Sequence, residues 1–142
     1  MQIKHILLPV DGSSYSGNAT NYAIHLAKLC GSRVTAVSCY EWLGHMVEVP
    51  ESMTDKLKGN FARQAEEILE QTARKLSAEG IENETDLKEG APGKMLTNLA
   101  KSKKFDLIIM GSHGHSDISG LFLGSVTHKV LNTIYCPVLV VP

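Results

Sequence analysis

Nine segments alternate between strand-like and helix-like patterns, and this alternation restricts the fold of the chain more than any other feature. The strand-like segments span residues 3–10, 33–40, 82–90, 105–110 and 137–141. Between them, helices are expected over residues 16–30, 54–79, 92–100 and 125–134. Strands that alternate with helices predict a parallel sheet covered by helices on both faces.

The length of the chain and the character of one strand refine this prediction. With 142 residues, of which 43% are hydrophobic, the chain suits a single domain over residues 1–142. Right-handed crossovers then favour an open, twisted, Rossmann-like α/β sheet of five parallel strands in the order 3-2-1-4-5. The polar segment 82–90 is the third strand, and we expect it at an edge of the sheet, where one face meets water.

Composition and charge exclude several classes of protein. A formal net charge of -1 does not suit a nucleic-acid binder, and no apolar run approaches the roughly 20 residues of a membrane span. Cys30, Cys39 and Cys136 lie far apart without a CxxC pair, which predicts neither a disulfide framework nor a zinc site. We expect a cytoplasmic protein that binds neither nucleic acid nor membranes.

A long glycine-rich stretch between the fourth strand and the last helix indicates a binding function. Residues 110–130 read MGSHGHSDISGLFLGSVTHKV, whereas two to six residues normally connect such elements. In the predicted order, this stretch and residues 9–14, PVDGSS, leave neighbouring strands where the order reverses, and ligands bind at that point. The amides of residues 124–127, at a helix start, and the hydroxyls of Ser125 and Thr127 are therefore candidate donors to phosphate.

Purely structural explanations of these residues stay open. Ser125 would serve equally as a helix N-cap, with the glycines as turn residues. Asp11 precedes the first helix together with two serines, so it would either cap that helix or contact a nucleotide. The contact would be to a ribose hydroxyl or an adenine amine, or would pass through a hydrated magnesium ion.

The spacing of the glycines is similar to a known signature. Two residues separate Gly111 from Gly114, and nine residues separate Gly114 from Gly124, which Ser125 follows. This pattern resembles the ATP-binding signature of the universal stress protein family. The segments PVDGS, MGSHG, GSV and CPVLVV extend the resemblance over the whole chain. Members of that family with the signature bind ATP, and members without it do not.

The resemblance implies a set of ligand contacts. The backbone positions that would hold the ribose and phosphates are Gly111, Gly114, Gly124, Ser125 and Val126, with His113 and Thr127 as further phosphate neighbours. The positions that would surround the adenosine are Pro9, Val10, Asp11, Val37 and Met110. The expected ligand is ATP, ADP or AMP with Mg²⁺, and no side chain except Asp11, through water, is expected near the metal.

The same residues favour nucleotide binding over catalysis. No arginine lies near the loop, and the nearest lysine, Lys129, is about one turn into the last helix. Phosphoryl transfer needs cations that neutralise the transferred group, while His113 and His115 are general bases only in principle. We expect a stress-related regulator or sensor. The alternatives are a slow Mg²⁺-dependent ATP hydrolase and a protein-interaction module whose glycine loop is structural.

Two further segments bear on partners. Residues 137–141 are expected at the open edge of the sheet, where an apolar strand pairs readily with another chain. The family resemblance also implies a homodimer through this strand. Residues 41–53 are expected to form a loop or lid, in which Trp42, Met46 and Met53 pack in the ordinary way, cover the adenine or contact a partner.

Overall fold

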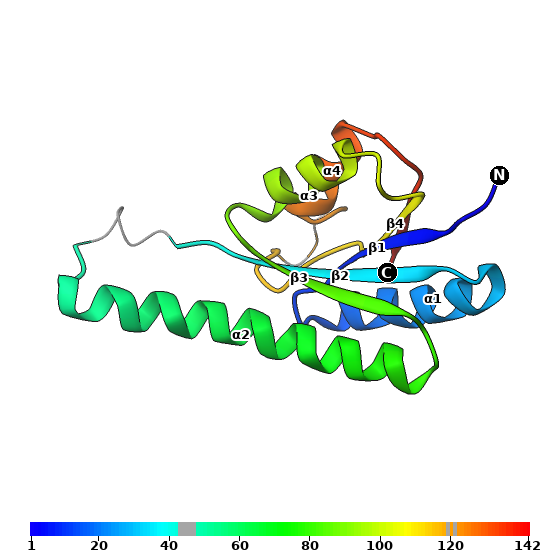
Figure 1. The fold of residues 1–142 in the computed structure, drawn as a ribbon. Coiled ribbons are helices and arrows are strands. Elements are labelled where there is room, and N and C mark those ends of the chain that lie inside the picture. The colour runs from blue at the N-terminus through cyan, green and yellow to red at the C-terminus, as the bar shows by residue number, and fades with distance from the viewer. Residues whose placement is uncertain (43–47, 119, 121) are drawn as a thin grey trace.

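A computed structural model describes residues 1–42, 48–118, 120 and 122–142 of the chain, and its centre is a five-stranded parallel sheet (Figure 1). The strands are β1 (His5–Pro9), β2 (Arg33–Tyr40), β3 (Asn83–Glu89), β4 (Leu107–Gly111) and β5 (Val138–Val141). Their order is β3-β2-β1-β4-β5, and every neighbouring pair is parallel. The predicted fold class and strand order are confirmed, including the place of the polar strand β3 at one edge.

In the described residues, four helices cover the two faces of the sheet: α1 (Ser14–Cys30), α2 (Glu51–Ala78), α3 (Pro92–Lys101) and α4 (Ser125–Asn132). Successive residues of a strand point to opposite faces. Ile6 and Leu8 of β1 therefore pack with α1 and α2, whereas Leu7 packs with α3 and α4. Figure 1 shows the two pairs of helices on opposite sides of the sheet. This double burial explains why β1 reads as a continuous apolar run.

Helix α2 begins earlier than predicted, so part of the predicted lid is helical. Its first residue is Glu51, directly after Pro50, whose extended backbone serves as the N-cap without a side-chain hydrogen bond. Met53 therefore lies in the helix and is half exposed. The ring of Trp42 packs against Phe61 of α2, with 6.2 Å between the ring centroids. Residues 43–47, which include Met46, lie outside the described part of the chain.

The fourth strand lies slightly later in the sequence than predicted. It spans Leu107–Gly111 rather than residues 105–110, because Asp106 forms a turn-like link to β1 before the strand begins. The first glycine of the glycine-rich stretch is thus the last residue of β4. The other elements begin and end within about two residues of their predicted bounds.

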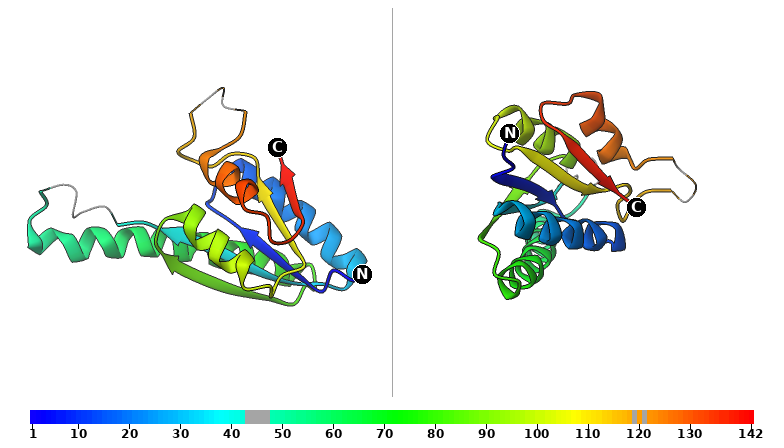
Figure 2. Two further views of the ribbon diagram at one scale, coloured as in Figure 1. Left: turned by 90° about the horizontal axis from the view of Figure 1, so that it is seen from above. Right: turned by 90° about the vertical axis from the view of Figure 1, so that its right-hand side faces the viewer.

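The topology places one long connection at the carboxyl end of the sheet. Strands β1 and β4 are neighbours, and the chain leaves them in opposite directions, to α1 on one face and to α4 on the other. Figure 2 shows β5 as the outermost strand beyond β4, with the C-terminus at its end. Within the described residues, we find no helix with the length and apolar character that a bilayer span requires.

Candidate functional site

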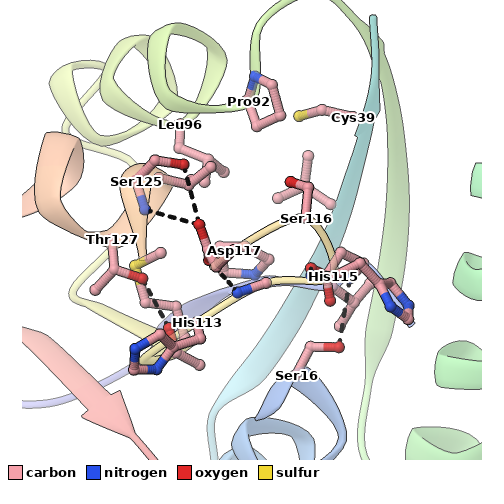
Figure 3. Close-up of a pocket in the computed structure, with 18 residues that line it drawn as sticks. Ser16, Cys39, Pro92, Leu96, His113, His115, Ser116, Asp117, Ser125 and Thr127 are labelled. Carbon is pink, nitrogen blue, oxygen red and sulfur yellow. Dashed lines mark hydrogen bonds between the residues drawn. The ribbon is translucent and has the colours of Figure 1, made fainter. Parts of the chain in front are cut away.

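A cavity of about 250 Å³ lies where the order of the strands reverses, beyond the carboxyl ends of β1, β2 and β4 (Figure 3). The first turns of α3 and α4 and the glycine-rich stretch close its other sides. The residues that line it are Pro9, Val10, Asp11, Ser16, Val37, Cys39, Pro92, Leu96, Met110, Gly111, His113, Gly114, His115, Ser116, Asp117, Ser125, Val126 and Thr127. An apolar cavity with a few polar groups is the usual form of a small-molecule site.

The inner part of the cavity is apolar. Val37 and Cys39 alternate along β2 and so face the same side, and Pro92 and Leu96 lie about one turn apart at the start of α3. Burial raises the pKa of the Cys39 thiol to about 11, with the nearby charge of Asp86 in the same direction. The thiol is therefore neutral at physiological pH, and this part of the site suits a flat, uncharged ring.

The signature glycines are required by close packing rather than by unusual backbone angles. Positive φ angles occur at Gly12 and Gly120 but not at Gly111, Gly114 or Gly124. A Cβ atom at Gly111 would lie 2.7 Å from Cβ of Tyr15 in α1, and one at Gly114 would lie 2.7 Å from Asp11 Oδ2. Each glycine thus lets a neighbouring group approach the backbone where a side chain would block it.

Gly124 has the most crowded surroundings of the three. A Cβ atom there would lie 2.9 Å from Cα of His113 and would overlap the carboxylate of Asp117. Its amide donates to the carbonyl oxygen of Ser112 at 2.7 Å, which holds the start of α4 against the end of β4. Gly124 is the N-cap of α4, so the interpretation of Ser125 as N-cap is wrong.

A carboxylate occupies two of the backbone amides that the sequence assigns to phosphate. Asp117 Oδ2 accepts from the amide of Gly114 at 2.5 Å, and Oδ1 accepts from the amide of Ser125 at 3.1 Å (Figure 3). The hydroxyl of Ser125 also donates to Oδ1, at 3.3 Å. Donors from the loop and from the first residue of α4 therefore converge on one anionic group at the mouth of the cavity.

The same contacts control the charge of Asp117. Burial opposes ionisation, but the N–H groups of Gly114 and Ser125, the Ser125 hydroxyl and the nearby His113 outweigh it and lower the pKa of the carboxyl group below its ordinary value of 3.8. Asp117 is ionised at neutral pH. The sequence analysis missed this residue, because an aspartate inside a glycine-rich loop reads as an ordinary turn residue.

Asp11 connects the two segments that leave β1 and β4. Its Oδ1 accepts from the amide of Ser13 at 2.9 Å, and its Oδ2 accepts from the amide of His115 at 3.1 Å. The N-cap of α1 is Ser13, whose hydroxyl oxygen accepts from the amide of Ser16. Asp11 is therefore not the helix cap, and its carboxylate fixes the glycine-rich stretch across the entrance of the cavity.

The remaining polar candidates have defined partners. Thr127 is buried, and its hydroxyl donates to the carbonyl oxygen of Gly111 at 2.8 Å, so it positions α4 on β4. His113 Nδ1 lies 2.9 Å from the hydroxyl oxygen of Ser112, and its ring packs on Tyr15 with 5.1 Å between centroids. These contacts use the hydroxyl of Thr127 and one ring nitrogen of His113 within the protein.

Positive charge is scarce around the cavity. Among the described residues that line it, none is lysine or arginine. The side chain of Lys129 runs along α3, where its Cδ lies 2.7 Å from the Cβ position of Gly93. A group of three or more histidine, cysteine, aspartate or glutamate side chains able to hold a metal is also absent from the described residues. The site thus offers main-chain donors to an anion.

Comparison with known proteins identifies the family. The model of the universal stress protein family matches residues 2–142, which is nearly the whole chain. The chain belongs to the universal stress protein family. Among its relatives, the universal stress protein YxiE of Bacillus subtilis is 35% identical over 96% of this chain and 97% of its own length.

Solved structures of universal stress proteins share the fold. MJ0577 of Methanocaldococcus jannaschii superposes with a TM-score of 0.86 at 27% identity, covering 99% of this chain and 96% of that one. A universal stress protein solved in complex with cAMP superposes with a TM-score of 0.72 at 25% identity, covering 99% and 98% of the two chains. The arrangement of sheet and helices described above is therefore the arrangement of this family.

The structure brings together nearly all the residues singled out in the sequence. Every predicted site residue except Gly124 lines the cavity, and Gly124 lies directly behind the Asp117 carboxylate. The lining residues absent from the prediction include Ser16, Cys39, Pro92, Leu96, Ser116 and Asp117. Two of these had a usable signal, since Cys39 alternates with Val37 on one strand and Pro92 opens a helix whose start faces the same crevice.

Proposed function

We propose that this universal stress protein binds an adenine nucleotide, ATP with Mg²⁺, and acts as a stress-related regulator or sensor. One observation carries the proposal: the amides of Gly114 and Ser125 converge on an anion at the mouth of an apolar cavity. A nucleotide combines these two features, because it has a flat base and an anionic tail. The universal stress protein solved with cAMP, an adenine nucleotide, supports the same class of ligand.

The base and the phosphates suit opposite ends of the cavity. Val37, Cys39 and Leu96 offer the adenine ring an apolar surface, with a neutral thiol at its edge. Gly114, Ser125 and Val126 lie at the polar end, where the N-terminus of α4 favours negative charge. The distance between the two ends is bridged by the ribose, beside Pro9, Val10 and Asp11.

A magnesium ion fits the charge balance of this site. Asp11 and Asp117 both bring carboxylates to the polar end, and the described lining residues include no lysine or arginine to offset them. Mg²⁺ prefers oxygen ligands and keeps several waters, so a hydrated ion between Asp11 and the phosphates would reduce the repulsion. The residues present fit such an ion through water rather than by direct coordination.

The site favours binding over turnover. Transfer of a phosphoryl group needs positive charge at the transferred group and an oriented acceptor, and backbone amides supply only partial charges. We therefore propose that occupancy of the site, rather than hydrolysis, is the signal.

A homodimer would transmit this signal. Strand β5 lies at the edge of the sheet, and its residues Val138, Leu139 and Val140 are partly exposed, so it can pair with β5 of a second copy. The free thiols of Cys30, Cys39 and Cys136 suit a cytoplasmic location.

Calorimetric titration of the protein with ATP, with and without Mg²⁺, tests the proposal directly. We expect saturable binding of one ATP per chain, tighter with Mg²⁺, and phosphate release no faster than in a blank. Mass spectrometry of protein denatured after purification would show whether an adenine nucleotide is carried along. Absence of binding to ATP, ADP and AMP at millimolar concentration would refute the proposal, and sustained Mg²⁺-dependent phosphate release would replace the sensor with a hydrolase. Sedimentation at micromolar concentration tests the dimer.

A further inference from the structure

Asp117 occupies the donors that the phosphates of a nucleotide would need. Its two carboxylate oxygens take the amide of Gly114 at 2.5 Å, the amide of Ser125 at 3.1 Å and the Ser125 hydroxyl at 3.3 Å. Both residues belong to the glycine signature. A carboxylate and a phosphate accept hydrogen bonds in the same way, and a donor that points at one cannot serve the other fully. Phosphate binding at these amides therefore requires Asp117 to leave.

The surroundings of Asp117 allow it to leave. The residue sits on the loop between β4 and α4, where its neighbours Ser116 and Ile118 are exposed. Its own amide makes one long hydrogen bond, 3.4 Å to the carbonyl oxygen of Gly114. Its side chain accepts hydrogen bonds from Gly114 and Ser125, and all three residues line the cavity; Figure 3 shows the contact between Asp117 and Ser125. A rotation of the side chain toward solvent breaks these contacts without disturbing the core.

We propose that Asp117 is an internal competitor for the phosphate position and sets how strongly the protein prefers a nucleotide over a nucleoside. This inference rests on the proposed adenine-nucleotide site. Adenosine fills the apolar end and does not need the amides of Gly114 and Ser125, so Asp117 stays in place. A nucleotide binds through those amides only in the fraction of molecules in which Asp117 has moved away. Its apparent affinity is reduced by that fraction.

Charge adds to the effect of occupancy. After displacement the Asp117 carboxylate remains on the same loop, and Asp11 Oδ2 already accepts from His115 on the other side of Gly114. Two carboxylates thus flank the position of an anionic tail. The penalty grows with the number of phosphates that reach the loop. The part due to Asp117 disappears when residue 117 carries no charge and accepts no hydrogen bond.

The test compares ligands and variants by calorimetric titration without Mg²⁺. Adenosine, AMP, ADP and ATP are titrated into the wild type, Asp117→Ala, Asp117→Asn and Asp55→Asn. Asp55 is an exposed residue of α2 outside the cavity, so its variant removes one negative charge without touching the site. Circular dichroism and thermal unfolding check that each variant is folded.

We expect Asp117→Ala to bind ATP about twofold more tightly than the wild type, as when about half of the molecules hold the internal carboxylate, and the removal of charge repulsion adds to this gain. Asp117→Asn gains less, because its side-chain oxygen still accepts from the amides. Adenosine binds equally to all four proteins, and Asp55→Asn matches the wild type throughout. The shortest nucleotide that gains affinity identifies the phosphate that replaces Asp117.

The outcomes separate this inference from the proposed function. If the wild type binds none of the nucleotides either without Mg²⁺ or with it, the proposed function itself fails. If the wild type binds ATP but Asp117→Ala binds it equally or more weakly, Asp117 only orders the loop and the competitor is refuted. An equal gain in Asp55→Asn, or a gain for adenosine, would also refute it. A ligand-free readout is the nuclear magnetic resonance of the Gly114 and Ser125 amides, which should shift upfield in Asp117→Ala before any ligand is added.

Discussion

Asp106 and Asp117 make the same kind of contact at opposite ends of the sheet. Asp106 Oδ2 accepts from the amides of Lys4 and His5, at 2.9 and 3.0 Å, and so ties the start of β4 to β1. Asp117 accepts from two amides beside the cavity at the carboxyl ends of the strands. In the first case the amides belong to the first residue of β1 and the residue before it, and β1 is itself paired with β2 and β4. In the second they belong to a loop and a helix start, so a ligand has room to take the place of the carboxylate.

If Asp117 is exchangeable as proposed, the surroundings of a carboxylate, together with the further hydrogen bonds of its backbone, decide whether it is structural or exchangeable. The amide of Asp106 also donates to the carbonyl oxygen of His5, so the contact with β1 is fixed from both sides. Within the described part of the chain, the backbone of Asp117 adds one long hydrogen bond, from its amide to the carbonyl oxygen of Gly114. We expect substitution of Asp106 to change the stability of the fold, and substitutions around Asp117 to change ligand binding.

The largest effect is expected at Gly124, where the room for any anion is removed. In Gly124→Ala the new Cβ would lie 2.9 Å from Cα of His113, so the loop has to shift and the amides of Gly114 and Ser125 no longer converge. Loss of two charge-assisted hydrogen bonds predicts roughly a hundredfold weaker binding of ATP, measured by calorimetry. The matched control is Gly59→Ala, an exposed position of α2 with no atom within 4 Å of the new Cβ. If Gly124→Ala binds ATP with the affinity of the wild type, the phosphates do not bind at these amides.

The next effect is expected at the opposite end of the sheet. Asp106→Ala leaves the amides of Lys4 and His5 without their acceptor, and we expect it to lower the free energy of unfolding by about 1–3 kcal/mol. Binding of ATP should not change. Asp117→Ala should cost less than about 0.5 kcal/mol, because its amides open toward solvent. Urea unfolding of both variants measures the difference, and equal losses at the two positions would remove the distinction between them.

Much of the fold could be predicted because it follows from burial patterns that the sequence displays. The β1 segment ILLP is covered by helices on both faces of the sheet, whereas β3 (NETDLKE) is partly exposed to solvent. Gly31 ends α1 with a left-handed backbone at φ 68°. These features depend on neighbours in the sequence or on one face of the sheet. The start of α2 was missed because Pro50 caps the helix with its backbone alone, without the side chain that usually marks a helix start.

The candidate site could be located from the sequence but not resolved in detail. The spacing of Gly111, Gly114 and Gly124 identifies the loop and the helix start, because close backbone approach requires residues without a side chain. The carboxylate on the amides depends on how residues 117 and 125, eight positions apart, fold back on each other. No local pattern encodes that contact. The steric partner of Gly111, Tyr15 on α1, likewise follows only from the packing of a helix on the sheet.

A buried histidine, His5, lies at the same end of the sheet as Asp106 and makes stability depend on pH. His5 lies beside Phe105, its Nε2 is 2.6 Å from the Thr35 hydroxyl oxygen, and its Nδ1 has no partner among the described residues. Burial, and then the charge of Arg33, lower the pKa of His5 below its ordinary value of 6.5. The unfolded chain therefore takes up this proton more readily than the folded one, and stability falls as the pH drops below 6.5 toward the lowered pKa.

His5→Gln keeps a polar side chain at this position and removes the titration. We expect the wild type to lose stability relative to His5→Gln between pH 7 and pH 5.5, with a slope of at most about 1.4 kcal/mol per pH unit for one proton. Urea unfolding at a series of pH values measures this difference. The other histidines titrate equally in both proteins, so parallel curves would show that His5 is protonated equally easily in the folded and unfolded states.

The smallest effect is expected for the titration of Asp117 itself, at lower pH. Its pKa is below 3.8 in the folded protein, since the amides of Gly114 and Ser125 favour the ionised form. Ionised Asp117 therefore stabilises the fold above the ordinary pKa, and this contribution is lost as the pH falls through the lowered value. Because the side chain is partly exposed, solvent reduces the contribution to less than about 0.5 kcal/mol. Unfolding of the wild type and Asp117→Ala at a series of pH values between pH 5 and pH 2 measures this contribution. The stabilities of the two proteins should converge as the carboxyl group becomes protonated. A difference in stability that persists at pH 2 would mean that the contact does not depend on charge, and a phosphate would then gain little by replacing the carboxylate.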